Sequence, residues 1–207
     1  MTKSELHEIS TSGWIATFTG RKVCPLAPRP EDIDIRDVAH ALACINRFTG
    51  HCPEPYTVAQ HSVLASNIVP PALAIAGLLH DAAEAFMGDI ARPWKGKLRV
   101  VGDGRNAETG FRAAEDYLLR AIFDALKVEW PNADGWKAIK EADTTLLVTE
   151  ARDFFGHQAI YNDWHHIPAN GYVPLPREIV PQGWRTARHR FLERWNELTG
   201  QSVTIEN

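Results

Sequence analysis

A short segment near the middle of the chain combines groups that bind divalent metal ions. His80 and Asp81 are adjacent and supply an imidazole and a carboxylate within one turn of a predicted helix. Both groups are good ligands for a divalent cation. Glu84 follows four residues after His80, so on a continuous helix it projects from the same face. These ionisable groups end the apolar run 73–79, where burial without partners is costly, so we interpret them as a metal site with a spare carboxylate.

Two residues elsewhere in the chain are candidates to complete this site. Apolar residues recur at helical spacing in the predicted helix 135–155, and Asp143 lies within that stripe. An unpaired carboxylate there is unfavourable by roughly several kcal/mol, so it needs a cation. His61, on an earlier predicted helix, adds a fourth ligand, and the site requires His61 and Asp143 to lie close to His80. Glu150 shares the stripe, and we expect it to form a buried pair with a basic residue.

The elements predicted around these residues are nearly all helical. One short strand is expected at 14–20. Apolar periodicity and capping residues predict helices at about 34–48, 57–69, 71–88, 106–127, 135–155 and 184–198. Residues 88–104 are predicted to form a loop, and the proline-rich stretch 156–183 a long excursion or hairpin. The pattern predicts one mostly helical domain over 1–207, with a core at about 31–155 and an extension at 156–207.

Composition and charge favour a globular cytoplasmic protein. Hydrophobic residues make up 44% of the chain and charged residues 23%, a balance that permits a real core. The net charge of -4 argues against a coat for duplex nucleic acid, but it is compatible with a small phosphorylated ligand. The three cysteines lack a C-x-x-C spacing, which favours reduced thiols. Residues 1–12 lack the apolar core of a signal peptide, and the longest apolar run, 71–79, is too short to span a membrane.

Together these motifs resemble those of the HD-domain metal-dependent phosphohydrolases. The order His61, then His80-Asp81, then a distant Asp143 is similar to the H…HD…D pattern of that superfamily. Four stretches occur in the same order as in the bacterial 5'-deoxynucleotidases and the related phage deoxyadenylate triphosphohydrolases: 45–48, 58–62, 79–84 and 88–95. The resemblance covers about residues 34–155. It implies an all-α HD-domain helical bundle, and because family members often dimerise, it also implies a homodimer.

The resemblance further implies a role for each candidate residue. One divalent metal ion (Mn, Co, Zn, Fe or Mg) would be held by His61, His80, Asp81 and Asp143. Glu84 would be the catalytic acid/base. The substrate-binding residues would be Arg47 on the phosphate, Phe48 on the base or sugar, Asp89 on the sugar 3'-hydroxyl and Lys95 on the phosphate. The branch usually has Trp where this chain has Phe48, and its members lack the long 156–183 excursion, so the base preference stays open.

Several functions remain open from the sequence. We favour hydrolysis of a deoxynucleoside 5'-monophosphate to nucleoside and phosphate, and the alternative is removal of triphosphate from a deoxynucleoside triphosphate. A non-catalytic sensor of nucleotide or metal is a third option, although the spare carboxylate of Glu84 argues against it. Hydrolysis of cyclic or alarmone nucleotides is less favoured because 88–95 resembles the deoxynucleotidases. For Arg47 and Lys95 the alternative is an ordinary surface charge, and for Phe48 a core position.

Overall fold

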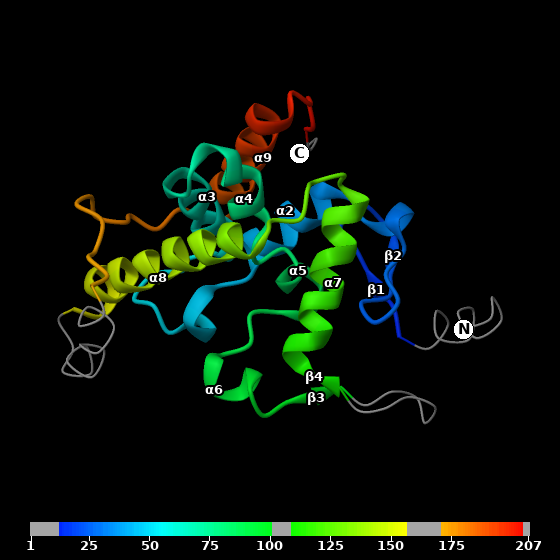
Figure 1. Ribbon diagram of the computed structural model, residues 1–207, viewed down its shortest axis with the longest axis horizontal. Helices are drawn as coiled ribbons and strands as arrows, with labels where there is room; N and C mark the ends of the chain where they lie inside the picture. The colour runs from blue at the N-terminus through cyan, green and yellow to red at the C-terminus, as the bar shows by residue number, and fades with distance from the viewer. Residues whose placement is uncertain (1–12, 101–108, 157–170, 205–207) are drawn as a thin grey trace.

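The fold is known from a computed structural model, which describes residues 13–100, 109–156 and 171–204. Most of these residues are helical, as the sequence predicts. In Figure 1 the long helix α8 (Ala133–Phe155) runs beside α3 (Val58–Ile68) and α4 (Ala74–Leu79), while α7 (Phe111–Ala125) stands upright in the view. The helix α3 therefore lies at the centre of the arrangement and contacts α4, α8 and the C-terminal helix α9 (Trp184–Thr199).

The hydrophobic core joins helices from both ends of the chain. Apolar side chains of α2 (Ile35–Cys44) recur every three or four residues and pack against α9. The largest fully buried apolar side chains include Leu42, Leu78, Leu79, Leu118, Phe123, Phe191 and Trp195. Each stabilises the fold by roughly 1.5–3 kcal/mol through burial. This core fixes α3 and α4 relative to each other and so holds the backbone that carries both histidines of the predicted site.

Capping side chains set the starts of α2, α3 and α8, which explains why these positions agree with the prediction. The Thr57 hydroxyl accepts a hydrogen bond from the Gln60 amide at 3.2 Å at the start of α3. Asn132 accepts one from the Gly135 amide at 2.8 Å and begins α8. Such caps satisfy amides that have no partner within the helix. The predicted helices at 57–69, 135–155 and 184–198 are confirmed to within two residues.

Asp34 caps α2 and also binds two arginines, which gives the helix a predictable pH dependence. Its carboxylate accepts from the Arg36 amide at 2.9 Å and lies 2.8 Å from Arg21 and 2.6 Å from the Arg36 guanidinium. The hydrogen bond from Arg36 lowers the pKa of Asp34. The ionised group therefore stabilises the fold above the unfolded carboxyl pKa of about 3.9, and this contribution is lost as the pH falls through the lowered folded value.

We expect Asp34→Asn to lower the free energy of unfolding at pH 7 by about 0.5–1 kcal/mol, because the amide can still cap the helix but loses both ion pairs. Denaturant titrations at pH 7 and at pH 3 would measure the effect. The difference from the wild type should shrink at the lower pH, because this carboxyl has its ordinary pKa in the unfolded chain and takes up a proton there, so the ionised form stabilises the fold less. A difference of the same size at both pH values would contradict the assigned electrostatic contribution.

In the described part of the chain, two small antiparallel strand pairs accompany the helices. Strand β1 (Ile15–Ala16) confirms the predicted N-terminal strand in shorter form and pairs with β2 (Lys22–Val23), a partner that the sequence did not predict. Strands β3 (Arg99–Val100) and β4 (Thr109–Gly110) pair at the start of α7. The prediction of a plain loop over 88–104 is wrong, because this stretch contains β3 and the short helix α6 (Arg92–Lys95), whose early proline suits a helix start.

The predicted helix at 34–48 is wrong at its C-terminal end. Helix α2 stops at Cys44, and the following residues turn toward the start of α3. The Arg47 amide donates to the Tyr56 carbonyl at 2.8 Å, and the Val58 amide donates to the Ile45 carbonyl at 3.0 Å. These bonds to a neighbouring segment replace those that would continue the helix. The turn that follows carries Phe48 at φ 55°, a left-handed conformation that bulky residues rarely adopt.

The predicted continuous helix at 71–88 is also interrupted. A 3₁₀ turn (Pro71–Leu73) leads into α4, which ends at Leu79, and four residues separate it from α5 (Glu84–Met87). Between them the amides of Ala82 and Glu84 bond to the carbonyls three residues back. Side chains three residues apart eclipse each other in such turns. Glu84 is therefore in register with Asp81, whereas a regular helix would align it with His80.

The C-terminal extension lies along α3 and α8. The predicted hairpin falls partly on residues 157–170, which lie outside the described residues, and the described stretch 171–183 contains no strand. Side chains of the two helices hold this stretch through its backbone: Gln60 bonds to Val180 and Gln182, and Arg152 bonds to Leu175. Within the described ranges, none of the helices has the length and apolar character needed to cross a membrane.

Candidate metal centre

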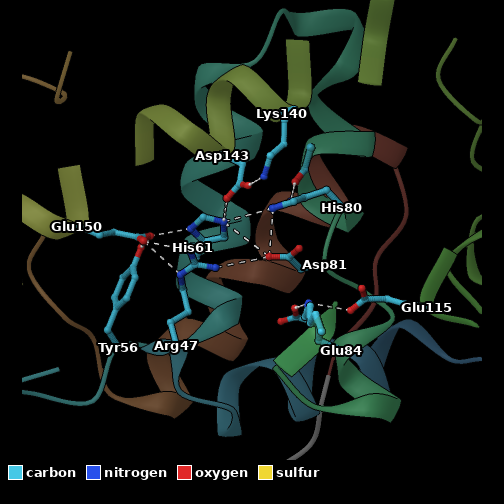
Figure 2. Close-up of polar contacts among 12 residues, drawn as sticks. Arg47, Tyr56, His61, His80, Asp81, Glu84, Glu115, Lys140, Asp143 and Glu150 are labelled. Carbon is cyan, nitrogen blue, oxygen red and sulfur yellow. Dashed lines mark hydrogen bonds and ion pairs between the residues drawn. The ribbon is translucent and has the colours of Figure 1, made fainter. Parts of the chain in front are cut away.

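Three side chains from separate helices converge on one point. His61 comes from α3, His80 directly follows α4, and Asp143 comes from α8; Figure 2 shows them pointing toward one another. The Nε2 atom of His61 lies 3.3 Å from Nε2 of His80 and 3.4 Å from Oδ1 of Asp143. One ligand atom from each residue falls within 4.8 Å of the other two, so the group can hold a metal ion. The predicted proximity of these three residues is confirmed.

Asp81 borders the same point from the turn after α4. Its Oδ2 atom lies 3.1 Å from Nε2 of His80 and 3.7 Å from Nε2 of His61. Ligand atoms that surround one ion tetrahedrally at about 2.1 Å are about 3.4 Å apart. The separations of 3.1–3.7 Å between these atoms match that spacing. Asp81 therefore lies at ligand-like distances from both histidines, whereas the ligand atoms that all lie within 4.8 Å of one another come from His61, His80 and Asp143.

Both imidazoles are oriented by hydrogen bonds on their other nitrogen. Nδ1 of His61 donates to Oε1 of Glu150 at 2.7 Å, and Nδ1 of His80 donates to the Gly77 carbonyl at 2.8 Å. A neutral imidazole with its proton on Nδ1 presents a lone pair on Nε2, which is how metal-binding histidines are commonly held. Both Nε2 atoms face the shared point, and each ring is therefore oriented to donate an electron pair there.

The charges around this point also suit a divalent cation. Burial alone would raise the pKa values of Asp81 and Asp143, but the neighbouring histidines outweigh it and lower them, so both carboxylates are ionised. Burial would lower the pKa of His80, but the Asp81 carboxylate raises it to about 9. The two carboxylates therefore stabilise either the protonated form of His80 or a bound metal ion. A metal ion must displace the proton of His80 when it binds.

Glu150 supports His61 through a buried network. Its carboxylate is fully buried and binds the His61 ring, the Tyr56 hydroxyl at 3.0 Å and the Arg47 guanidinium at 3.1 Å. The predicted buried pair with a basic residue is confirmed, and Arg47 is that residue. The sequence analysis missed the contacts with His61 and Tyr56, since both partners lie about 90 positions away. The only sequence feature that pointed to this network was Glu150 itself, a carboxylate in the apolar stripe two helical turns after Asp143.

We expect Glu150→Gln to weaken metal binding by roughly 10- to 100-fold, the usual effect of changing an outer partner of a metal-binding histidine. Glutamine keeps the shape but removes the negative charge that favours a proton on Nδ1 and a free Nε2 in His61. Competition with a chelating dye would measure the affinity. The matched control is Glu141→Gln, an exposed position on the same helix. Equal affinities for both variants and the wild type would contradict the assigned role.

Glu84, the predicted acid/base, lies just outside the four converging groups. It is 4% exposed, and Lys95 donates to its Oε1 atom at 2.8 Å. Burial and the nearby Asp81 carboxylate raise the pKa of Glu84 to about 9, although Lys95 opposes them. Glu84 therefore holds a proton at neutral pH. Its other oxygen, Oε2, is buried and has no hydrogen-bond partner among the residues that the structure describes.

The predicted substrate contacts surround the centre, and two of them already bind carboxylates. Arg47 lies between Glu150 and Asp81, 3.7 Å from the latter. Lys95 pairs with Glu84 and with Glu115 of α7. Phe48 and Asp89 are half-buried: the ring of Phe48 packs edge-on against Phe155, and burial raises the pKa of Asp89 while Arg47 and Lys95 oppose it. The structure thus places Arg47 and Lys95 among the site's carboxyl groups, and the ring centre of Phe48 lies 5.6 Å from the Arg47 guanidinium.

A pocket of about 140 Å³ opens beside the converging ligands. It is lined by His80, Asp81, Trp136, Ile139, Lys140 and Asp143. The lining joins three of the predicted metal ligands to one apolar face of α8. Sequence analysis assigned Ile139 only to the apolar stripe of this helix and did not single out Trp136 or Lys140. Their place in the pocket gives a small ligand room next to the candidate ion.

Sequence comparison with known proteins shows the family to which the chain belongs. No family model matches the chain. YfdR, an uncharacterized protein of Escherichia coli (strain K12), is 32% identical over 190 residues, which cover 90% of this chain and 96% of YfdR. RCAP_rcc00048, an uncharacterized protein of Rhodobacter capsulatus, is 33% identical over 155 residues, 69% of this chain and 74% of that protein. At this identity and coverage, the chain belongs to the family that contains YfdR.

Proposed function

We propose that the protein is a metal-dependent phosphohydrolase of the HD-domain type that acts on deoxynucleotides. The preferred reaction converts a deoxynucleoside 5'-monophosphate to nucleoside and phosphate. Two kinds of support meet here: the ordered motifs at 45–48, 58–62, 79–84 and 88–95, and the convergence of the H…HD…D residues in space.

One observation carries the proposal. The Nε2 atoms of His61 and His80 face each other 3.3 Å apart. Each ring donates a hydrogen bond from its Nδ1 to a fixed acceptor. Two such lone pairs repel unless a cation or a proton lies between them. The protonated carboxyl of Glu84 lies beside this point without belonging to it. A metal site with a separate acid/base is what hydrolysis of a phosphate ester needs, whereas simple binding needs only the site.

The chain's own residues divide the chemistry between them. A bound divalent ion would lower the pKa of a water molecule and polarise a phosphoryl oxygen. Glu84 would give its proton to the leaving oxygen and could then take one from the attacking water. Arg47 and Lys95 would offset part of the phosphate charge from their positions among the carboxylates. Phe48 would border the base or sugar, and Asp89 would accept a hydrogen bond from the sugar 3'-hydroxyl.

A nucleotide panel tests the proposal directly. The protein is loaded with Mn²⁺ or Co²⁺, incubated with deoxy- and ribonucleoside mono- and triphosphates, and assayed for phosphate and for tripolyphosphate. Phosphate from the deoxynucleoside monophosphates is the expected result. Tripolyphosphate from the triphosphates would instead assign the alternative reaction. Tight nucleotide binding without turnover on any ester would replace the proposal with a sensor.

We expect Asp89→Asn to lower kcat/KM for nucleotides that carry a 3'-hydroxyl while the metal content stays at the wild-type level. The amide accepts the hydrogen bond from that hydroxyl without the full negative charge of the carboxylate, so the contact should weaken. The kcat/KM values for a matched pair of nucleotides with and without the 3'-hydroxyl measure it, and the variant should narrow the difference between them. An unchanged difference would remove Asp89 from sugar recognition.

A further inference from the structure

Lys95 is held between two carboxylates from different helices. Its ammonium group donates to Oε1 of Glu84 at 2.8 Å and to Oε1 of Glu115 at 2.9 Å, and the side chains of Lys95 and Glu115 are each 19% exposed. Figure 2 draws Glu84 and Glu115 together, with Asp81 above them. The proposed role of Lys95 as a phosphate contact leaves this second carboxylate unexplained. The contact between Glu115 and Lys95 therefore points to a separate role for Glu115.

The three residues sit on elements of very different rigidity. Glu84 lies in α5 and Lys95 in α6, and each helix is four residues long. Helices shorter than about 12 residues are not stable by themselves. Glu115 lies in the 15-residue helix α7, which buries Leu118, Ile122 and other apolar side chains in the core. Strands β3 and β4 also join the segment after α6 to the start of α7. Glu115 is thus the rigid end of the chain of contacts.

The hydrogen-bond pattern distinguishes the two oxygens of Glu84. Lys95 occupies Oε1, so the oxygen left to carry and transfer a proton is Oε2, which is buried and lacks a partner within the described part of the chain. A carboxyl group that was free to rotate would exchange its two oxygens between these positions. Lys95 prevents this exchange only while its own position is fixed, and the second carboxylate fixes it.

We propose that Glu115 is a positioning residue: through Lys95 it holds Oε1 of Glu84 and thereby directs Oε2 toward the reacting oxygen of the phosphate ester. The inference rests on the proposed function, since it gives Glu115 a part in the same reaction. Glu115 itself does not contact the substrate. Its removal should leave the metal-binding side chains in place and impair the proton transfer by Glu84.

The test is a double-mutant cycle that links Glu115 to Glu84. Glu115→Ala should lower kcat by roughly 10- to 100-fold, since misplacing a catalytic group costs about this much. Metal content should stay near its wild-type value. In a Glu84→Ala background the same change should have no further effect on kcat, whereas a residue with a merely structural role would lower it again. Glu115→Gln, which can still accept from Lys95, should recover part of the loss.

Labelling of Lys95 supplies a readout that does not depend on activity. An amine-reactive reagent followed by mass spectrometry should modify Lys95 faster in Glu115→Ala than in the wild type, because one of its two hydrogen-bond partners is gone. The matched control for both measurements is Asp116→Ala, the exposed neighbour on α7, which should behave like the wild type. Unchanged labelling, or additive losses with Glu84→Ala, would overturn the inference alone. A wild type that hydrolyses no phosphate ester would overturn the proposed function and the inference with it.

Discussion

Asp143→Ala is expected to abolish stoichiometric metal binding and, with it, hydrolysis. Asp143 contributes one of the three ligand atoms that lie within 4.8 Å of one another, and its carboxylate is ionised because His61 lowers its pKa against the effect of burial. Removing it takes away both a donor atom and one of the two negative charges that balance a divalent ion. The loss of affinity should exceed the roughly 10- to 100-fold loss expected for an outer partner such as Glu150.

Metal content after dialysis, measured by atomic emission, and chelator competition would check this result. Glu141→Ala is the matched control, because it removes an exposed carboxylate from the same helix two residues away. The two variants should have similar helix content by circular dichroism. If Asp143→Ala retained one equivalent of metal with wild-type affinity, the ion would have to bind elsewhere, and the assigned centre would be wrong.

Glu84→Ala is expected to keep the metal and lose on the order of 10²- to 10⁴-fold in kcat, the usual contribution of a positioned general acid or base. Glu84 lies outside the converging ligands, so the metal content should not change. Lys95 keeps its second partner, Glu115, in this variant, so the local structure should persist. Steady-state kinetics on the best ester from the nucleotide panel would measure the effect.

Glu84→Gln separates proton transfer from packing. The glutamine side chain fills the same buried space and can still accept a hydrogen bond from Lys95, but it cannot donate an acidic proton. It should therefore be nearly as slow as Glu84→Ala. Recovery of turnover in the glutamine variant would mean that Glu84 acts by shape or hydrogen bonding. Near-normal turnover in both variants would show that the proton comes from another group.

The sequence by itself determined the helices that carry the ligands. It also identified the residues within them that can bind a metal ion or take part in catalysis. Thr57 and Asn132 satisfy free amides at the starts of α3 and α8, and apolar spacing fixes which face of each helix is buried. Both signals are local, since they depend on residues three or four positions apart. That is why α3, α8 and α9 begin and end near their predicted positions, and why Asp143 stood out within its apolar stripe.

Only the tertiary structure decided how these helices meet and what each charged group binds. The contact of His61 with Glu150 joins residues 89 positions apart, and no local pattern encodes such a pairing. Arg47 was predicted to lie on a helix, but hydrogen bonds to the segment before α3 end that helix early and turn Arg47 toward Glu150. Glu84 aligns with Asp81 because the turn at 80–83 is closed by hydrogen bonds between residues three positions apart. The packing around α4 and α5 favours this turn. Side-chain spacing is a property of one helix, whereas a metal centre needs several helices to be packed at fixed distances.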